Sequence, residues 1–253
     1  MSDSPLPEPT EEDLWYFQHN GFHRVRQALP EELLVRLNVA TNRAIADCVE
    51  PVVWETGSTD RRPEDVRRLS KILSRDEAYL QAASHPIILD TLTGLIGPNV
   101  ELLTNKHNHI MVRPAGSEPV YWHAGEETWD PCLLTALIYL EESTLENGCI
   151  RLVPGSHRRP FRHPRRPGGE WTASEWLPRS LPVPMPRGGI LLFNDACFHA
   201  SDVNRSDGSR RSMTFGYRAH DTHDVDKDDP VKILVRGERV YTGHPHPFPG
   251  EQA

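Results

Sequence analysis

Turn-forming residues interrupt the second half of the chain so often that it can form only short elements. From residue 99 onward, the apolar or alternating runs cover residues 100–104, 107–113, 133–140, 149–153, 189–193 and 212–218. Between them stand turn signals such as Pro114-Ala115-Gly116, Glu146-Asn147-Gly148, Pro154-Gly155-Ser156 and Arg187-Gly188-Gly189. Many short strands at this spacing are typical of a β-sandwich or barrel. We therefore predict a mainly β fold for this part of the chain.

The first hundred residues carry helical signals instead. Thr10-Glu11-Glu12-Asp13 resembles a capping box, and Asn20-Gly21 would end the helix that it opens. Pro30 stands in the first turn of a second expected helix, at about 31–47, and a further helical stretch covers about 75–95. Residues 51–70 are polar and rich in arginine, and we interpret them as a mobile loop.

These patterns indicate a single domain, in which N-terminal helices pack against a C-terminal double sheet. We divide the 253 residues into an N-terminal helical part (1–98), a β core (99–220) and a C-terminal extension (221–253). The net charge of −8 argues against binding to a nucleic-acid polymer. No apolar run is long enough to span a membrane and no secretory signal is visible. The four cysteines are widely spaced, which is typical of reduced thiols, and we expect a cytoplasmic protein.

Two histidines and one arginine are the strongest candidates for chemistry. We expect His123 and His199 each to lie at the end of a strand, where a sandwich can present a side chain at its interior mouth. Arg210 follows His199 by a distance that suits a hairpin returning a guanidinium to the same mouth. A guanidinium there can bind a carboxylate through two parallel hydrogen bonds.

Three blocks around these residues resemble one known family. They are Trp122-His123, the segment Glu146-Asn147-Gly148 through Pro154-Gly155-Ser156-His157, and His199 through Arg210. In this order they are similar to the phytanoyl-CoA dioxygenase family of non-haem iron(II), 2-oxoglutarate-dependent oxygenases, over about residues 10–220. The stretch Tyr121-Trp122-His123 with Glu127-Thr128-Trp129 further resembles the ectoine-hydroxylase branch.

The resemblance implies a fold, cofactors and site residues. The fold would be a double-stranded β-helix, the cupin-like jelly roll. His123 and His199 would bind iron(II), and Arg210 would bind the distal carboxylate of 2-oxoglutarate, with O2 as the other co-substrate. Ser201 and Ser212 match positions that assist the contact of Arg210 with that carboxylate.

One position departs from the family pattern. The family has an acid two residues after the first histidine, and this chain has Gly125 there. One hypothesis is an oxygenase with a displaced carboxylate, from Glu126 or Glu127. A second is a catalytically inactive jelly-roll binding module.

The third hypothesis, which we favour from the sequence, is a halogenase. In halogenases with this cofactor set an alanine or glycine replaces the acid, and chloride binds iron in its place. Gly125 would then be the chloride vacancy, offering space and an unpaired backbone N–H. The enzyme would chlorinate an unactivated C–H bond in natural-product biosynthesis. The retention of Arg210 and of both histidines argues against an inactive module.

The substrate is harder to predict. Residues 158–166 hold five arginines in nine residues, in a segment that borders the active-site entrance in this family. A basic cluster on an acidic protein indicates an anionic small molecule, such as a nucleotide, although a solvated loop explains it equally well. The candidate substrate-binding residues are Arg158, Arg162, Arg165 and Trp129. Nothing in the sequence indicates an oligomeric state.

Overall fold

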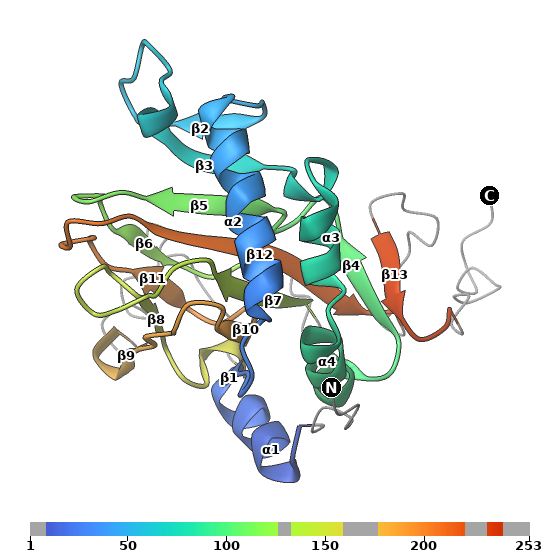
Figure 1. Ribbon diagram of the computed structural model, residues 1–253. Helices are drawn as coiled ribbons and strands as arrows, with labels where there is room; N and C mark the ends of the chain where they lie inside the picture. The colour runs from blue at the N-terminus through green and yellow to red at the C-terminus, as the bar shows by residue number, and fades with distance from the viewer. Residues whose placement is uncertain (1–8, 126–132, 159–176, 221–231, 240–253) are drawn as a thin grey trace, which may run out of the picture.

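The computed structural model describes residues 9–125, 133–158, 177–220 and 232–239, whose strands form two antiparallel sheets (Figure 1). The large sheet has the order β1 (Phe22–Arg24), β10 (Ile190–Asn194), β7 (Leu133–Tyr139), β12 (Arg210–Ala219), β5 (His109–Arg113), β3 (Val66–Ser70), β2 (Val52–Trp54). Off this path, β4 (Val100–Leu103) pairs with both β12 and β13 (Lys232–Arg236). The small sheet has the order β6 (Val120–His123), β11 (His199–Ser201), β8 (Ile150–Leu152), β9 (Leu181–Pro182). The mainly β fold predicted from the sequence is confirmed.

The helices lie on one side of the large sheet, in the N-terminal part of the chain (Figure 1). They are α1 (Glu11–Asn20), α2 (Glu31–Ala46), α3 (Glu77–Ala83) and α4 (Pro86–Ile96), with short 3-10 turns at Pro63–Asp65, Ile72–Ser74, Ser156–Arg158 and Leu177–Arg179. None of the described helices is both long and apolar enough to cross a membrane.

The ends of α1 follow from its sequence. Thr10 Oγ1 accepts a hydrogen bond from the backbone N–H of Asp13, and the Asp13 carboxylate accepts one from the N–H of Thr10. The helix ends at Gly21, whose φ of 81° lies in the left-handed region that favours glycine. Both cap signals of the sequence are therefore confirmed.

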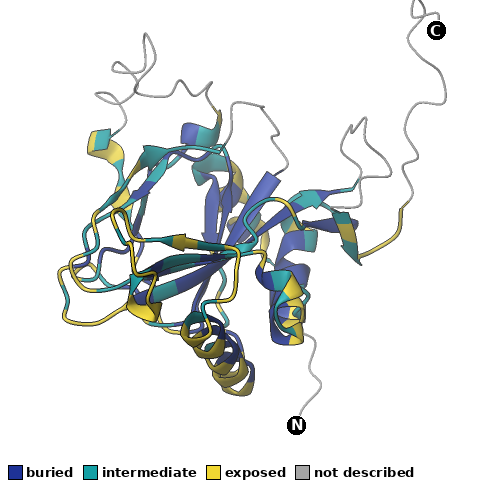
Figure 2. Cartoon of the chain, turned by 90° about the horizontal axis from the view of Figure 1, so that it is seen from above, coloured by how far each residue is buried: buried dark blue, intermediate teal, exposed yellow. Residues whose placement is uncertain are grey.

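Two cores surround the large sheet. The side of β7 that carries Leu134, Ala136 and Ile138 belongs to a core shared with the helices, in which Leu37 of α2 is fully buried. The opposite side carries Leu137 and belongs to a second core between the sheets. Figure 2, from above, shows the helices as a layer beside the buried strands, with their exposed residues facing outward. Burial on both faces explains the continuous apolar run of β7.

The prediction of a mobile loop over residues 51–70 was wrong. This segment holds β2 and β3, and β3 pairs with β5 inside the large sheet. Val66 and Leu69 are fully buried, whereas Arg67 and Arg68 between them remove the regular alternation that indicates a strand. The helical stretch at 75–95 is two helices, because α4 begins anew at Pro86.

Candidate functional site

His123 and His199 are cross-strand neighbours in the small sheet. His123 ends β6 and His199 begins β11, and the two residues pair directly in the antiparallel register. Directly opposed residues project from the same face of a sheet, and the two imidazole centroids lie 4.2 Å apart. The pairing of these histidines therefore follows from the pairing of their strands.

Both rings are oriented by the same local hydrogen bond. His123 Nδ1 lies 2.8 Å from the carbonyl oxygen of Tyr121, and His199 Nδ1 lies 2.8 Å from that of Cys197. Because a carbonyl only accepts, each Nδ1 carries the proton and each Nε2 keeps its lone pair. Burial, and to a smaller extent the nearby His123, lower the pKa of His199 to about 3. The His199 ring is therefore uncharged at neutral pH, as a metal ligand must be.

The Pro154-Gly155-Ser156-His157 turn holds the segment that leads to His199. Ser156 Oγ accepts a hydrogen bond from the N–H of Phe198 at 2.9 Å and donates one to the carbonyl of Val153 at 2.7 Å. His199 stands at the start of its strand, so the expectation that it ends one was wrong. The reason is the turn after β10, which crosses from the large sheet to the small sheet before His199.

Arg210 is the first residue of β12, in the large sheet, so the predicted hairpin between His199 and Arg210 is also wrong. The chain crosses between the sheets instead. Arg210 is only 4% exposed, and its Nε donates to the carbonyl of Asn147 at 3.1 Å. Asn147 belongs to the Glu146-Asn147-Gly148 turn, so that this motif supports the guanidinium.

The Arg210 guanidinium is a buried cation with no carboxylate partner among the described residues. Burial lowers its pKa, and interaction with Tyr139 and Cys149 opposes that shift. The Tyr139 hydroxyl is itself buried and, in the described structure, makes no well-formed hydrogen bond, although the Ser143 hydroxyl lies near it. A buried charge beside an unpaired hydroxyl is costly without a ligand, and both groups suit a carboxylate.

The two candidate serines lie on opposite sheets. Ser212 is buried two residues after Arg210 on β12 and pairs with Tyr139 of β7. Ser201 ends β11 and pairs with Ile150 of β8. In the part of the chain that the structure describes, neither hydroxyl hydrogen-bonds to Arg210, so their role as helpers of that residue stays a prediction.

Gly125 does not leave an open space, contrary to our expectation. A Cβ atom added to Gly125 would overlap Oδ2 and Cγ of Asp195. The Gly125 N–H is not unpaired either, because it donates to the Asp195 carbonyl at 2.7 Å. The physical reason is the turn after β10, which brings an aspartate against the end of β6.

Hydrogen bonds hold one oxygen of the Asp195 carboxylate, Oδ1. Its Oδ1 accepts a hydrogen bond from His107 Nε2 at 2.8 Å and a long one from Thr135 Oγ1 at 3.4 Å. Burial alone would raise the pKa of Asp195, but the hydrogen bond and charge of His107, aided by His199, lower it. The carboxylate is therefore ionised at neutral pH.

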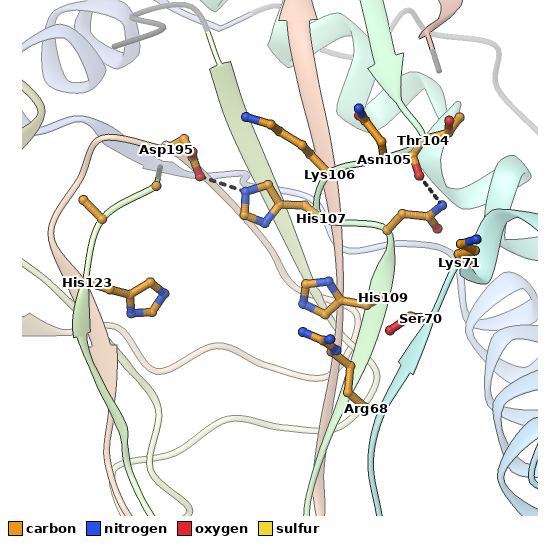
Figure 3. A pocket seen from close by; sticks show the side chains of 13 residues that line it. Arg68, Ser70, Lys71, Thr104, Asn105, Lys106, His107, His109, His123 and Asp195 are labelled. Carbon is orange, nitrogen blue, oxygen red and sulfur yellow. Dashed lines mark hydrogen bonds and ion pairs between the residues drawn. The ribbon is translucent and has the colours of Figure 1, made fainter. Parts of the chain in front are cut away.

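A cavity of about 560 Å³ opens between the sheets, a volume that suits a small-molecule ligand. Figure 3 shows His123 on one side of it, with His107 and His109 on the other. Both His107 and His109 line the cavity. Burial, and to a smaller extent the adjacent His107 and Arg68, lower the pKa of His109 to about 3.

The basic side chains of the cavity are ones that we did not predict to bind substrate. Arg68 of β3 lines it, together with Lys71 and Lys106. Arg158 is exposed at the end of a 3-10 turn and is not part of this lining. The other candidate substrate-binding residues, Arg162, Arg165 and Trp129, lie outside the described residues.

No group of three His, Cys, Asp or Glu side chains in the described ranges lies close enough to hold a metal ion as it stands. Glu126 and Glu127, the expected displaced carboxylates, lie outside those ranges. The histidine pair offers two ring nitrogens, so a metal bound there would need further ligands from elsewhere.

Sequence reasoning missed Asp195, Arg68 and Tyr139. A usable signal existed for Tyr139, because a tyrosine within a buried apolar run needs a partner for its hydroxyl. For Asp195 the signal was an acidic residue directly after the apolar strand that leads to His199. Arg68 had no such signal, since its segment resembles an exposed loop.

Comparison with known proteins gives consistent matches. The model of the family described as "Phytanoyl-CoA dioxygenase (PhyH)" matches residues 17–212. The chain is 26% identical over 240 residues to the dioxygenase lolE1 of Epichloe uncinata, covering 90% of this chain and 88% of that protein. It shares 21% identity and a TM-score of 0.71 with EctD from S. alaskensis with bound Fe, over 88% of this chain and 80% of that one.

A further structure resembles the chain at a similar level. The epimerase SnoN, in complex with Fe3+, alpha ketoglutarate and nogalamycin RO, shares 20% identity and a TM-score of 0.68 over 83% of each chain. Likenesses at this level of identity establish the shared fold, and they confirm the jelly roll expected from the sequence.

Proposed function

The chain belongs to the phytanoyl-CoA dioxygenase family, and we propose that it is a non-haem iron(II), 2-oxoglutarate-dependent oxygenase acting on a small molecule. The observation that carries the proposal is the cross-strand pair His123–His199, whose Nδ1 atoms both donate to backbone carbonyls. Metal-binding histidines are oriented by such hydrogen bonds. The Nε2 atoms of this pair remain available for iron.

Iron(II) held there would supply the activation of O2, at the expense of 2-oxoglutarate, that oxidation of an unactivated C–H bond requires. The residues of the chain would bind and orient the co-substrate. Arg210 would bind the distal carboxylate of 2-oxoglutarate, and the buried Tyr139 hydroxyl beside it is suited to donate a hydrogen bond. The inter-sheet core around Tyr139 would exclude water from that end of the co-substrate.

We propose oxygen insertion or a related oxidation as the outcome, rather than the chlorination that we favoured from the sequence. Two contacts support this choice. The Asp195 carboxylate fills the space at Gly125, and the Gly125 N–H is already bonded. A chloride at that place would lack both room and a donor, and it would lie beside a negative charge.

Chlorination remains the second candidate, because Gly125 itself provides no carboxylate and the described residues contain no ready group of three ligands. A measurement of halide binding distinguishes oxygenation from chlorination, and it does not require the substrate to be known.

We expect the visible charge-transfer band of the anaerobic iron(II)–2-oxoglutarate complex to be insensitive to chloride, because Asp195 occupies the halide position. The measurement is a chloride titration of that band, with sulfate at matched ionic strength as the control. A saturable shift with chloride that sulfate does not reproduce would favour the halogenase.

We further propose that the small molecule is anionic. Arg68 supports this, because its Nε is buried without a hydrogen-bond partner in the described structure while its side chain lines the cavity. The arginine cluster at 158–166, with Trp129, is the alternative recognition segment from the sequence. A nucleotide remains one candidate substrate.

Arg68→Gln should weaken the binding of adenosine monophosphate, used as a probe, by about tenfold or more, because a charge-assisted contact is lost. Calorimetric titration of the enzyme loaded with 2-oxoglutarate measures this effect, and uncharged adenosine serves as the control ligand. Arg158→Gln is the matched variant outside the cavity. If Arg158→Gln weakens the binding and Arg68→Gln does not, recognition belongs to the 158–166 cluster.

A further inference from the structure

Two arginines are cross-strand neighbours in the large sheet. Arg210, the first residue of β12, pairs directly with Arg113, the last residue of β5. Directly opposed residues project from the same face of a sheet, and like charges in such a pair repel each other. The arrangement is therefore unfavourable unless an anion lies between or beside the two side chains.

Both arginines project into the space between the sheets. On β5, Val112 belongs to the core shared with the helices, so the next residue, Arg113, points to the opposite side. His109, on the same face of β5 as Arg113, lines the cavity between the sheets. On β12, Met213 belongs to the helix-side core, and Arg210, three residues earlier, faces the small sheet by the same alternation.

Arg113 has a donor that no described residue uses. One of its terminal nitrogens, Nη2, donates to the backbone carbonyl of Glu118, which orients the side chain. Its Nε is buried and, among the described residues, has no hydrogen-bond partner. A buried donor on a cation is costly when it is left unsatisfied. The Nε of Arg113 is therefore suited to bind an acceptor from a ligand.

Both guanidiniums are charged at neutral pH. Burial, and to a smaller extent the charges of Arg210 and Arg67, lower the pKa of Arg113 to about 10, and Glu118 opposes the shift. Burial also lowers the pKa of Arg210, but a guanidinium stays protonated in proteins. The effect of Arg210 on Arg113 shows that the two charges interact across the strand pair.

We propose that Arg113 is a second binding residue for the distal carboxylate of 2-oxoglutarate, which Arg113 and Arg210 hold together. This inference rests on the proposed function, because it requires the co-substrate at Arg210. Tyr139 completes the subsite from the other side of β12. It pairs with Ser212, two residues after Arg210, and its buried hydroxyl makes no well-formed hydrogen bond in the described structure. Three adjacent strands thus direct donors to one carboxylate, a group that accepts several hydrogen bonds.

A comparison of two 2-oxo acids isolates this contact. 2-Oxopentanoate has the carbon chain and the oxo acid end of 2-oxoglutarate, but it lacks the distal carboxylate. Both acids should produce a visible charge-transfer band with the iron(II) protein in the absence of oxygen. Only the binding of 2-oxoglutarate should depend on Arg113.

Arg113→Met should weaken the binding of 2-oxoglutarate by about tenfold or more, because a charge-assisted contact is lost. The affinity for 2-oxopentanoate should stay unchanged. Anaerobic titration of the charge-transfer band with each acid, at saturating iron, measures both affinities. Arg113→Lys should give an intermediate affinity for 2-oxoglutarate, because an ammonium keeps the charge but not the planar fork of donors.

Arg151→Met is the matched control. Arg151 lies on β8 between Ile150 and Leu152, which belong to the core between the sheets, so its half-buried side chain points to the other side of the small sheet. There it donates to Ser180. This variant should keep wild-type affinity for 2-oxoglutarate. Thermal unfolding of each iron-free variant verifies its fold, and Arg113→Lys serves as the test if Arg113→Met does not fold.

Two results would overturn the inference alone. One is wild-type affinity for 2-oxoglutarate in the folded Arg113 variants. The other is an equal loss of affinity for 2-oxoglutarate and for 2-oxopentanoate, which would assign Arg113 a structural role. In both cases the wild-type protein still forms the band, and the proposed function stands. If the wild-type protein forms no band with 2-oxoglutarate, the proposed function fails together with the inference.

Discussion

His199→Ala abolishes the iron(II)–2-oxoglutarate charge-transfer band: this is the largest effect that we expect from a single substitution. His199 pairs directly with His123, and its uncharged ring would provide one of the two histidine nitrogens of the proposed iron site. Its removal leaves a single imidazole, which cannot hold the ion at micromolar concentrations. Anaerobic visible spectroscopy with iron(II) and 2-oxoglutarate measures the band.

His19→Ala is the control for this substitution. His19 stacks on Trp15 in α1, outside the small sheet that carries the histidine pair, so its loss should leave the band intact. Equal thermal stability of the two variants would show that His199→Ala is folded. A band of wild-type intensity in His199→Ala would contradict the assignment of His199 as a ligand.

The second large effect is expected for Arg210→Ala, in which 2-oxoglutarate binding weakens far more than iron binding. The buried Arg210 guanidinium has no carboxylate partner among the described residues and is suited to a desolvated ion pair with the co-substrate; truncation of such a pair costs roughly 2–5 kcal/mol. This corresponds to a loss in affinity of about 30-fold or more. Titration of the charge-transfer band with 2-oxoglutarate, at saturating iron, gives the affinity.

The adjacent arginine provides the control. Arg211 points to the other side of β12, where it binds Glu141 and the amides of Asn38 and Asn42. Arg211→Gln should therefore leave the affinity for 2-oxoglutarate unchanged. Equal affinities for 2-oxoglutarate in Arg210→Ala and the wild type would place the co-substrate elsewhere.

Local signals in the sequence were enough to predict several elements. The caps of α1 at Thr10 and Gly21 and the buried run of β7 depend on residues near one another in the chain. The candidate pair His123 and His199 also came from the sequence, through motif segments around each residue. Such features can be predicted because hydrogen-bond capping and side-chain periodicity act over a few residues.

The segment at 51–70 shows where local signals fail. β3 is a strand because it pairs with β5, and its Arg68 points toward a cavity rather than toward solvent. A polar residue facing a ligand cavity has the same sequence signature as one facing water. The pairing that distinguishes them joins residues far apart in the chain.

The sequence alone determined that an acid was missing two residues after His123. Only the tertiary structure decided what stands in its place. The turn after β10 brings Asp195 against Gly125, and the turn before β5 brings His107 to the same carboxylate. Contacts between such distant segments depend on how the two sheets pack, so they cannot be predicted from the spacing of residues along one strand.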